Sequence, residues 1–389
     1  MLKARTPAFF GKNTSRFIKC IAIVLMLYHH LIGFDYWHLQ FVVRCVPWMV
    51  SFGKVCIDLF AFVTGVAFFV LKDRYEKGSY RLQKGISFLL QYQLVCLIFL
   101  TIGLFCSEPM PDFSTLLKNL FGWETGVGGT IVDYSIIPPV FTPFGKQYIN
   151  VCHAWYVFFY LLALAAYPLL ARLSTGKGML ADAGLLLLTF SLLRAFALLS
   201  GVSSLPFVDE FLDYLPIVAL GYLIAKNKAF EAFEKLPSYL SLGVGVFVCV
   251  ATIVIRYGET DAAEFPLRAA WIYVPLLVYF FAKVGKTGAF FLKKVPKLYK
   301  VCLFFVTFFA ANSMNVWYLH GIFNTPRQSL QWIAYLPRRS LLIVGWVLVL
   351  LSIVSFVLSF PQKMLSDWCR QVFYKIKKKR NGYDTTRTG

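Results

Sequence analysis

Long apolar runs dominate this sequence and restrict its fold more than any other feature. A transmembrane helix needs about 20 consecutive apolar residues to cross the hydrocarbon core of a bilayer. Hydrophobic residues make up 58% of the 389-residue chain, more than a soluble domain can hide. We therefore predict an all-α fold, a polytopic transmembrane bundle of about ten helices. The ten runs cover residues 17–34, 48–71, 86–106, 151–171, 179–200, 211–225, 239–255, 265–282, 301–322 and 340–360.

The charges of the connecting loops predict the orientation of these helices. With a cytoplasmic N-terminus, 29 of the 39 Lys and Arg residues lie in cytoplasmic segments, and the outer loops carry nine acidic residues. This bias indicates a multi-pass protein of the cytoplasmic (inner) cell membrane with both termini in the cytoplasm. The net charge of +20 then reflects contact with the lipid bilayer rather than with nucleic acid.

We expect one transmembrane domain over residues 1–360, with a long outer loop at about 107–150, and a basic cytoplasmic tail over 361–389. The loop contains Trp123 among several aromatic residues, which either stack on a sugar or pack within the loop itself. The tail is most simply an anchor to anionic headgroups. None of the nine cysteines forms a CxxC pair, so we expect buried apolar cysteines rather than disulfides or a zinc site. We also expect no other metal and no permanently bound cofactor.

The first apolar run carries two histidines, which are costly in hydrocarbon and therefore suggest a functional position. His30 follows Lys19 by eleven residues. On an α-helix this spacing puts both within about 20° of one face and roughly 16 Å apart along the axis. His29 points away from that face but remains a competitor for the same role. One face thus joins a cation at the membrane edge to an imidazole deeper inside.

Other polar residues fall in the same outer half of the membrane. His153 begins the fourth run, His320 ends the ninth, and Arg194 lies toward the outer end of the fifth. Asp58 interrupts the second run near mid-membrane, either as a counter-ion for an imidazolium or as a structural partner.

The cytoplasmic edge is basic in a different way. Arg81 and Lys84 are one turn apart at the start of the third run and face the same side. With Lys19 they could form a cationic mouth for a phosphorylated ligand arriving from the cytosol. The alternative is ordinary anchoring by positive residues on the inside of the membrane.

Five patterns occur in order along the chain. They are Lys19 followed eleven positions later by His30; a stretch with Gly, Val and a Phe-rich run from Gly53 to Gly65; the basic pair Arg81 and Lys84; His153-Ala154-Trp155-Tyr156; and Ser313 followed by Tyr318-Leu319-His320. Together they resemble the acyltransferase-3 family, integral-membrane enzymes that include bacterial O-acyltransferases of surface glycans. The family usually has Arg where Lys19 and Lys84 stand, and Lys lacks the bidentate fork of Arg.

The resemblance implies an O-acyltransferase that moves an acyl group, expected to be acetyl, from cytosolic acyl-CoA to a hydroxyl of a cell-surface or lipid-linked glycan. Lys19, Arg81 and Lys84 would hold the donor, acetyl-CoA or another acyl-CoA. His30, or else His29, would be the general base or the transient acyl carrier. The supporting residues would be Asp58, His153 and His320 in catalysis, and Trp155, Arg194 and Trp123 in acceptor binding.

A membrane transporter is the second hypothesis. Polar residues at mid-membrane and about ten spans also suit a proton-coupled carrier, with the histidines and Asp58 as a proton relay. The sequence shows no inverted pair of broken helices, which disfavours this hypothesis. Label transferred from acetyl-CoA to carbohydrate would distinguish the enzyme from the carrier.

Overall fold

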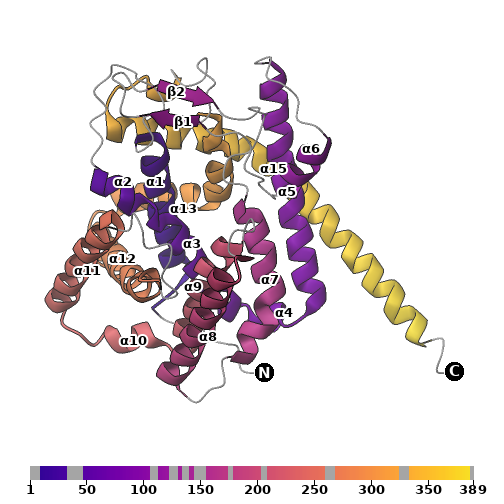
Figure 1. Ribbon diagram of the computed structural model, residues 1–389, viewed down its shortest axis with the longest axis horizontal. Coiled ribbons are helices and arrows are strands. Elements are labelled where there is room, and N and C mark those ends of the chain that lie inside the picture. Colours follow the sequence, from indigo (N-terminus) through magenta and orange to yellow (C-terminus); the bar gives the residue numbers. More distant parts are fainter. Residues whose placement is uncertain are drawn as a thin grey trace. The chain divides into compact units, whose positions relative to one another are not determined.

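The computed structural model describes residues 9–32, 47–105, 113–121, 130–133, 140–143, 155–173, 178–202, 208–258, 268–323 and 333–385. It is a helical protein (Figure 1) that divides into two compact units, Met1–Lys72 with Ala166–Ser352, and Asp73–Ala165 with Ile353–Gly389. The predicted all-α membrane fold is confirmed.

The first unit is built from nine α-helices and a 3-10 helix among the described residues. They are α1 (Lys12–Ile32), α2 (Pro47–Gly53), α3 (Val55–Val70), α8 (Met179–Leu199), α9 (Val208–Lys226), α10 (Ala229–Phe233), α11 (Ser238–Gly258), α12 (Ala270–Leu292), α13 (Pro296–Leu319) and the 3-10 helix η3 (His320–Ile322).

The second unit contains α4 (Lys72–Tyr75), α5 (Gly78–Phe105), α6 (Phe113–Leu120) and two short strands, β1 (Thr130–Asp133) and β2 (Val140–Pro143). Two helices, α7 (Trp155–Leu173) and α15 (Ser340–Thr385), pass from one unit to the other. The strands pair antiparallel, with Thr130 opposite Pro143 and Asp133 opposite Val140. They lie in the expected outer loop, so part of that loop forms a hairpin.

Each of the ten apolar runs forms a helix, but only eight helices within the described residues are long and apolar enough to cross a membrane. The apolar part of α7, Tyr156–Arg172, is shorter. The nineteen residues of α9 include Asp209, Glu210, Asp213 and Lys226, and these charges lower its apolar content. Within the described residues this criterion thus selects eight of the ten runs, and it leaves out the two whose helices have the shortest or most charged apolar segments.

Helices α3 and α9 make the most extensive helix pair of the first unit, and two glycines permit it. A Cβ atom on Gly65 would lie 1.8 Å from the Val218 carbonyl oxygen, and one on Gly221 would lie 2.3 Å from the Phe62 carbonyl oxygen. The two backbones therefore touch directly, as small residues allow in membrane helix pairs.

Two of the long spans contain an irregular turn. The second span, Trp48–Val70, is interrupted at Lys54, where the Lys54 and Ile57 amides bond three residues back rather than four. The ninth run ends in the 3-10 helix that begins at His320. Short 3-10 segments within a helix often accompany function.

The contact between α3 and α9 generates a stability prediction. Replacing Gly65 by Ala puts a methyl group on a neighbouring carbonyl, so we expect a loss of about 1–3 kcal/mol of unfolding free energy. The matched control is Gly184→Ala on α8, where no atom lies within 4 Å of the added Cβ. The control is expected to be neutral or to stabilise the helix by roughly 0.5–1 kcal/mol. Unfolding of the purified protein in detergent measures both, and equal stability of the two variants would contradict the contact.

Candidate active site

The structure brings together two histidines that are 290 positions apart in the sequence. His30 lies near the end of α1, and His320 begins η3, directly after α13, which packs along α1. The ring centroids are 4.8 Å apart, with 37° between the ring planes. Both side chains are buried, and His320 is fully so. Two imidazoles in contact inside the first unit form the centre of the candidate site.

Two hydrogen bonds to carbonyls set the tautomers of the neighbouring rings. His29 Nδ1 lies 2.8 Å from the Val50 carbonyl oxygen on α2, and His320 Nδ1 bonds to the Trp317 carbonyl oxygen. A carbonyl oxygen only accepts, so each Nδ1 carries the hydrogen. In the neutral ring, Nε2 is then the acceptor. His320 therefore contributes a basic nitrogen in a ring whose other nitrogen is fixed.

His29 also anchors α1 against α2. A Cβ atom on Gly53 would lie only 2.7 Å from the His29 Cβ atom, so α2 packs directly against α1 at this residue. The hydrogen bond to Val50 fixes the rotation of α1 at the same point. Nearby, the Tyr335 hydroxyl donates to the Leu31 carbonyl oxygen at 2.7 Å. These contacts hold the end of α1 on both sides of His30.

Asp58 forms a buried ion pair with Arg256, at the end of α11. Arg256 Nη2 donates to Asp58 Oδ2 at 2.6 Å, and the Asp58 side chain is 1% exposed. The guanidinium also lies 5.9 Å from the centroid of the Tyr273 ring. The sequence did not decide whether Asp58 is a counter-ion or a structural partner, and it did not predict that Arg256 is its partner. Arg256 follows an apolar run on the predicted outer side, where basic residues are scarce. This unusual position could have indicated a functional or structural role for Arg256.

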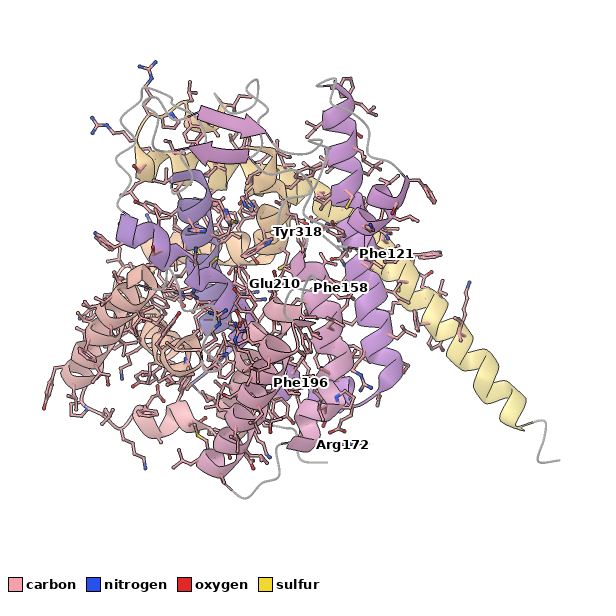
Figure 2. The ribbon with its side chains drawn as sticks, viewed as in Figure 1. Phe121, Phe158, Arg172, Phe196, Glu210 and Tyr318 are labelled. Carbon is pink, nitrogen blue, oxygen red and sulfur yellow. The ribbon has the colours of Figure 1, made fainter. Side chains whose placement is uncertain are left out.

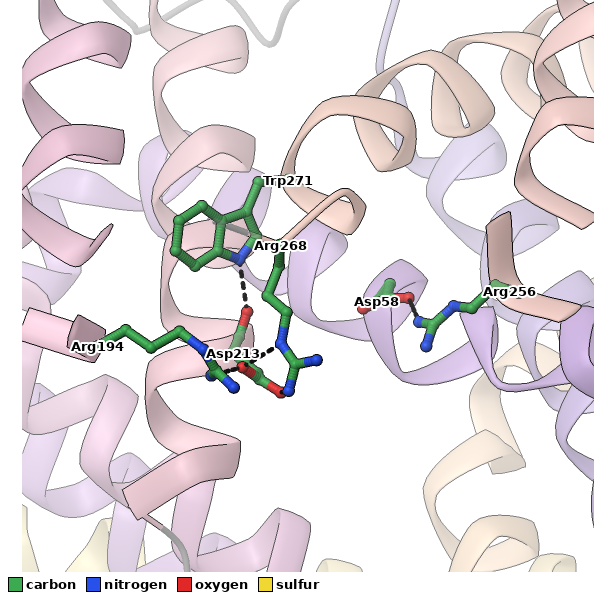
Figure 3. A network of polar contacts seen from close by, with 6 residues as sticks. All are labelled: Asp58, Arg194, Asp213, Arg256, Arg268 and Trp271. Carbon is green, nitrogen blue, oxygen red and sulfur yellow. Dashed lines mark hydrogen bonds and ion pairs between the residues drawn. The ribbon is translucent and has the colours of Figure 1, made fainter. Parts of the chain in front are cut away.

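A second charged cluster joins α8, α9 and α12 (Figure 3). The Asp213 carboxylate accepts from Arg194 and binds Arg268 through two bonds, Nε at 2.9 Å and Nη2 at 2.7 Å. The Trp271 indole donates to the Asp213 backbone carbonyl at 2.9 Å. Arg194, predicted to bind the acceptor, thus contacts a carboxylate of its own chain and is fully buried.

These groups lie close enough together to interact electrostatically. Tyr214 on α9 is within range of Asp58, Arg256 and Asp213, which links the two charged clusters. His29 is within range of Lys54 and Arg256, which links the histidines to the nearer cluster. Tyr318, labelled in Figure 2, is buried beside His320 along the chain.

The predicted donor-binding residues are divided between the two units. Lys19 lies on α1, half-buried, and α1 is an uninterrupted helix from Lys19 to His30. In the second unit, the Arg81 guanidinium donates to the Tyr75 and Glu76 carbonyl oxygens, which braces the turn after α4. Lys84 is exposed on α5. The cationic mouth that would combine all three residues stays a prediction.

The remaining predicted residues fall where the structure gives no side-chain geometry. Trp123 and His153 lie outside the described residues, and Trp155 is described only as the first residue of α7. Among the described residues, no group of three or more His, Cys, Asp or Glu is arranged to hold a metal ion.

A family model described as an acyltransferase domain, acyltransferase-3, matches residues 15–361, which include most of α1, both charged clusters and all three described histidines. The chain belongs to the acyltransferase-3 family. The searches of curated proteins and of solved structures found no match. The two paired histidines, His30 and His320, therefore belong to a membrane acyltransferase, and the family resemblance predicted from the sequence is confirmed.

The Asp213 cluster predicts a large stability effect. Asp213→Asn removes the negative charge between two guanidinium groups, one of them fully buried, and should lower the unfolding free energy by about 3–5 kcal/mol. The control is Lys286→Gln, which breaks a pair with Glu234 whose side chains are 34% and 37% exposed. We expect the control to cost at most about 1 kcal/mol.

Unfolding of both variants in detergent decides the comparison. A similar loss in the two would show that the Asp213 cluster contributes no more than a surface ion pair.

Proposed function

We propose that this membrane acyltransferase transfers an acyl group, acetyl by expectation, from cytosolic acyl-CoA to a hydroxyl of a cell-surface or lipid-linked glycan. The contact between His30 and His320 carries the proposal, because it supplies a titratable base next to a second base of fixed tautomer. A neutral imidazole suits proton transfer near neutral pH. The site would lie in the cytoplasmic (inner) membrane.

His30 would act as the general base. Its imidazole nitrogen takes the proton of the acceptor hydroxyl as the oxygen forms a bond to the thioester carbonyl carbon. The carbon–sulfur bond then breaks, and the proton passes to the departing thiolate, which leaves as CoA with a free thiol. In the alternative route, His30 first takes the acyl group from sulfur and then yields it to the hydroxyl oxygen.

His320 would serve His30 as a proton partner. Its Nδ1–H is held by the Trp317 carbonyl oxygen, so its Nε2 is the nitrogen able to receive a proton from the neighbouring ring. This role replaces the expected counter-ion role of Asp58, because Asp58 already has a short ion pair with Arg256. His153 remains a further candidate for proton transfer.

The substrates would approach from opposite sides. Lys19, Arg81 and Lys84 would hold the donor phosphates at the cytoplasmic edge. The pantetheine arm would then extend along α1 from Lys19 toward His30, over roughly 16 Å of helix. Trp123 and Trp155 would contact the acceptor from the outer side. For Arg194 we propose a supporting role through Asp213, since its side chain is already bound there.

Matched asparagine variants test which histidine does the chemistry. An asparagine amide can replace Nδ1–H as a donor to the Val50 carbonyl but cannot act as a base. His29→Asn should therefore keep most of the transfer activity. His30→Asn should lower the transfer activity by about 10²–10⁴-fold. His320→Asn should also lower the transfer activity, but by less.

The measurement is transfer of label from radiolabelled acetyl-CoA to carbohydrate in membranes, with mass spectrometry of the surface polysaccharide. The reverse ranking of the two neighbouring variants would assign the chemistry to His29. Solute uptake without CoA release would support the proton-coupled carrier instead and would overturn the proposed reaction.

A further inference from the structure

The last helix is much longer than a membrane span. α15 runs without interruption for 46 residues, Ser340–Thr385, and passes through Pro361 (Figure 1). At 1.5 Å per residue it is about 69 Å long, whereas the hydrocarbon core is about 30 Å thick. The tail expected after Phe360 is thus a continuation of the helix, and a large part of α15 must lie outside the hydrocarbon.

Contacts with α5 establish where α15 leaves the membrane. Gln362 Nε2 donates to the Gln91 carbonyl oxygen at 3.1 Å, and the Ser87 hydroxyl lies 2.9 Å from the Ser366 hydroxyl. Cys369 Sγ lies 3.9 Å from the Gln83 carbonyl oxygen. The three contacts are about one turn apart and fix an antiparallel register within the second unit. Cys369 is therefore level with the start of the apolar run of α5, at the edge predicted to be cytoplasmic.

The residues around this edge change character along the helix. Met364 and Trp368, on the membrane side of Cys369, are 73% and 58% exposed, as expected of side chains that face lipid. The basic residues beyond Cys369 are Arg370, Lys375, Lys377, Lys378, Lys379 and Arg380. At 100° per residue these positions are distributed around the helix rather than along one side. A tryptophan at the membrane boundary followed by a basic segment is typical of the cytoplasmic end of a span.

The charge of this segment selects the kind of membrane surface. Residues 361–385 contain seven Lys or Arg and two Asp. One of the acids, Asp367, pairs with Arg370 at 3.3 Å, and the other is Asp384. Clusters of four or more basic residues next to a transmembrane helix attract anionic headgroups. A zwitterionic surface offers no comparable attraction.

We propose that the part of α15 beyond Cys369 is a juxtamembrane basic helix that binds anionic phospholipid headgroups at the cytoplasmic face. Its Lys and Arg residues attract the headgroups, and Trp368 lies at the boundary of the acyl chains. The contacts with Gln83, Ser87 and Gln91 connect this helix to α5, which carries Arg81 and Lys84. Lipid binding here is independent of the proposed reaction, so either proposal can fail alone.

Native mass spectrometry of the full-length protein in detergent tests the proposal, with phosphatidylglycerol and phosphatidylcholine as probes. We expect phosphatidylglycerol to bind preferentially. Replacing Lys375, Lys377, Lys378 and Lys379 together by Gln should weaken its binding at least about tenfold. The matched control replaces four exposed lysines near the α12–α13 connection by Gln, namely Lys293, Lys294, Lys297 and Lys300. The control should retain most of the preference.

Two results would overturn the proposal. One is an unchanged preference in the tail variant. The other is an equal loss in the control, because the effect would then follow total charge rather than this helix. Thermal unfolding of both variants shows whether each remains folded. Trp368→Gln gives a second measure: it removes the tryptophan from the membrane boundary without changing charge, and it should also weaken phosphatidylglycerol binding.

Discussion

The direct contact between the α3 and α9 backbones determines where the charged groups of the first unit lie. Asp58 precedes Gly65 by seven residues on α3, and Asp213 precedes Gly221 by eight on α9. By the predicted topology both helices run in the same direction, so the two carboxylates lie at a similar depth. Tyr214 lies within electrostatic range of both carboxylates, in agreement with this placement. Two glycines therefore align the two ion clusters at a similar depth of the helix pair.

The clusters give the site a rigid frame at a high electrostatic cost. A buried ion costs several kcal/mol unless a partner and further hydrogen bonds compensate it. Asp213 accepts from two arginines, and Asp58 lies 2.6 Å from Arg256. Removing one member of a cluster would leave the remaining charges buried without compensation, at a cost of several kcal/mol. The members of each cluster therefore hold one another in place. The histidines differ, because they can be buried in the neutral form, which is the form suited to accepting a proton.

The sequence predicted the helices and the family, and it singled out the two histidines that the structure brings into contact. Apolar length locates spans because the bilayer has a fixed thickness, and His30 and His320 could be placed by counting along their helices. The sequence analysis missed the charged residues Asp213, Arg256 and Arg268. Each lies at or near the end of an apolar run, where a charged residue cannot be distinguished from an ordinary loop residue until its partner is known. Partners depend on which helices pack together, and single-sequence periodicity contains no information on that.

Under the proposed function, α1 must connect a cytosolic donor to an outer acceptor without moving much itself. Arg16 Nη1 donates to Thr307 Oγ1 at 3.4 Å near one end, and His29 and Leu31 are bonded at the other. A Cβ atom on Gly285 would lie 2.6 Å from the Phe17 ring, so α12 also packs closely against α1. A helix fixed at both ends keeps Lys19 and His30 at a constant separation. The acyl group must then travel along the helix on a flexible arm, as the pantetheine of an acyl-CoA would allow. Rocking of the helix, which a carrier requires, would have to break these contacts.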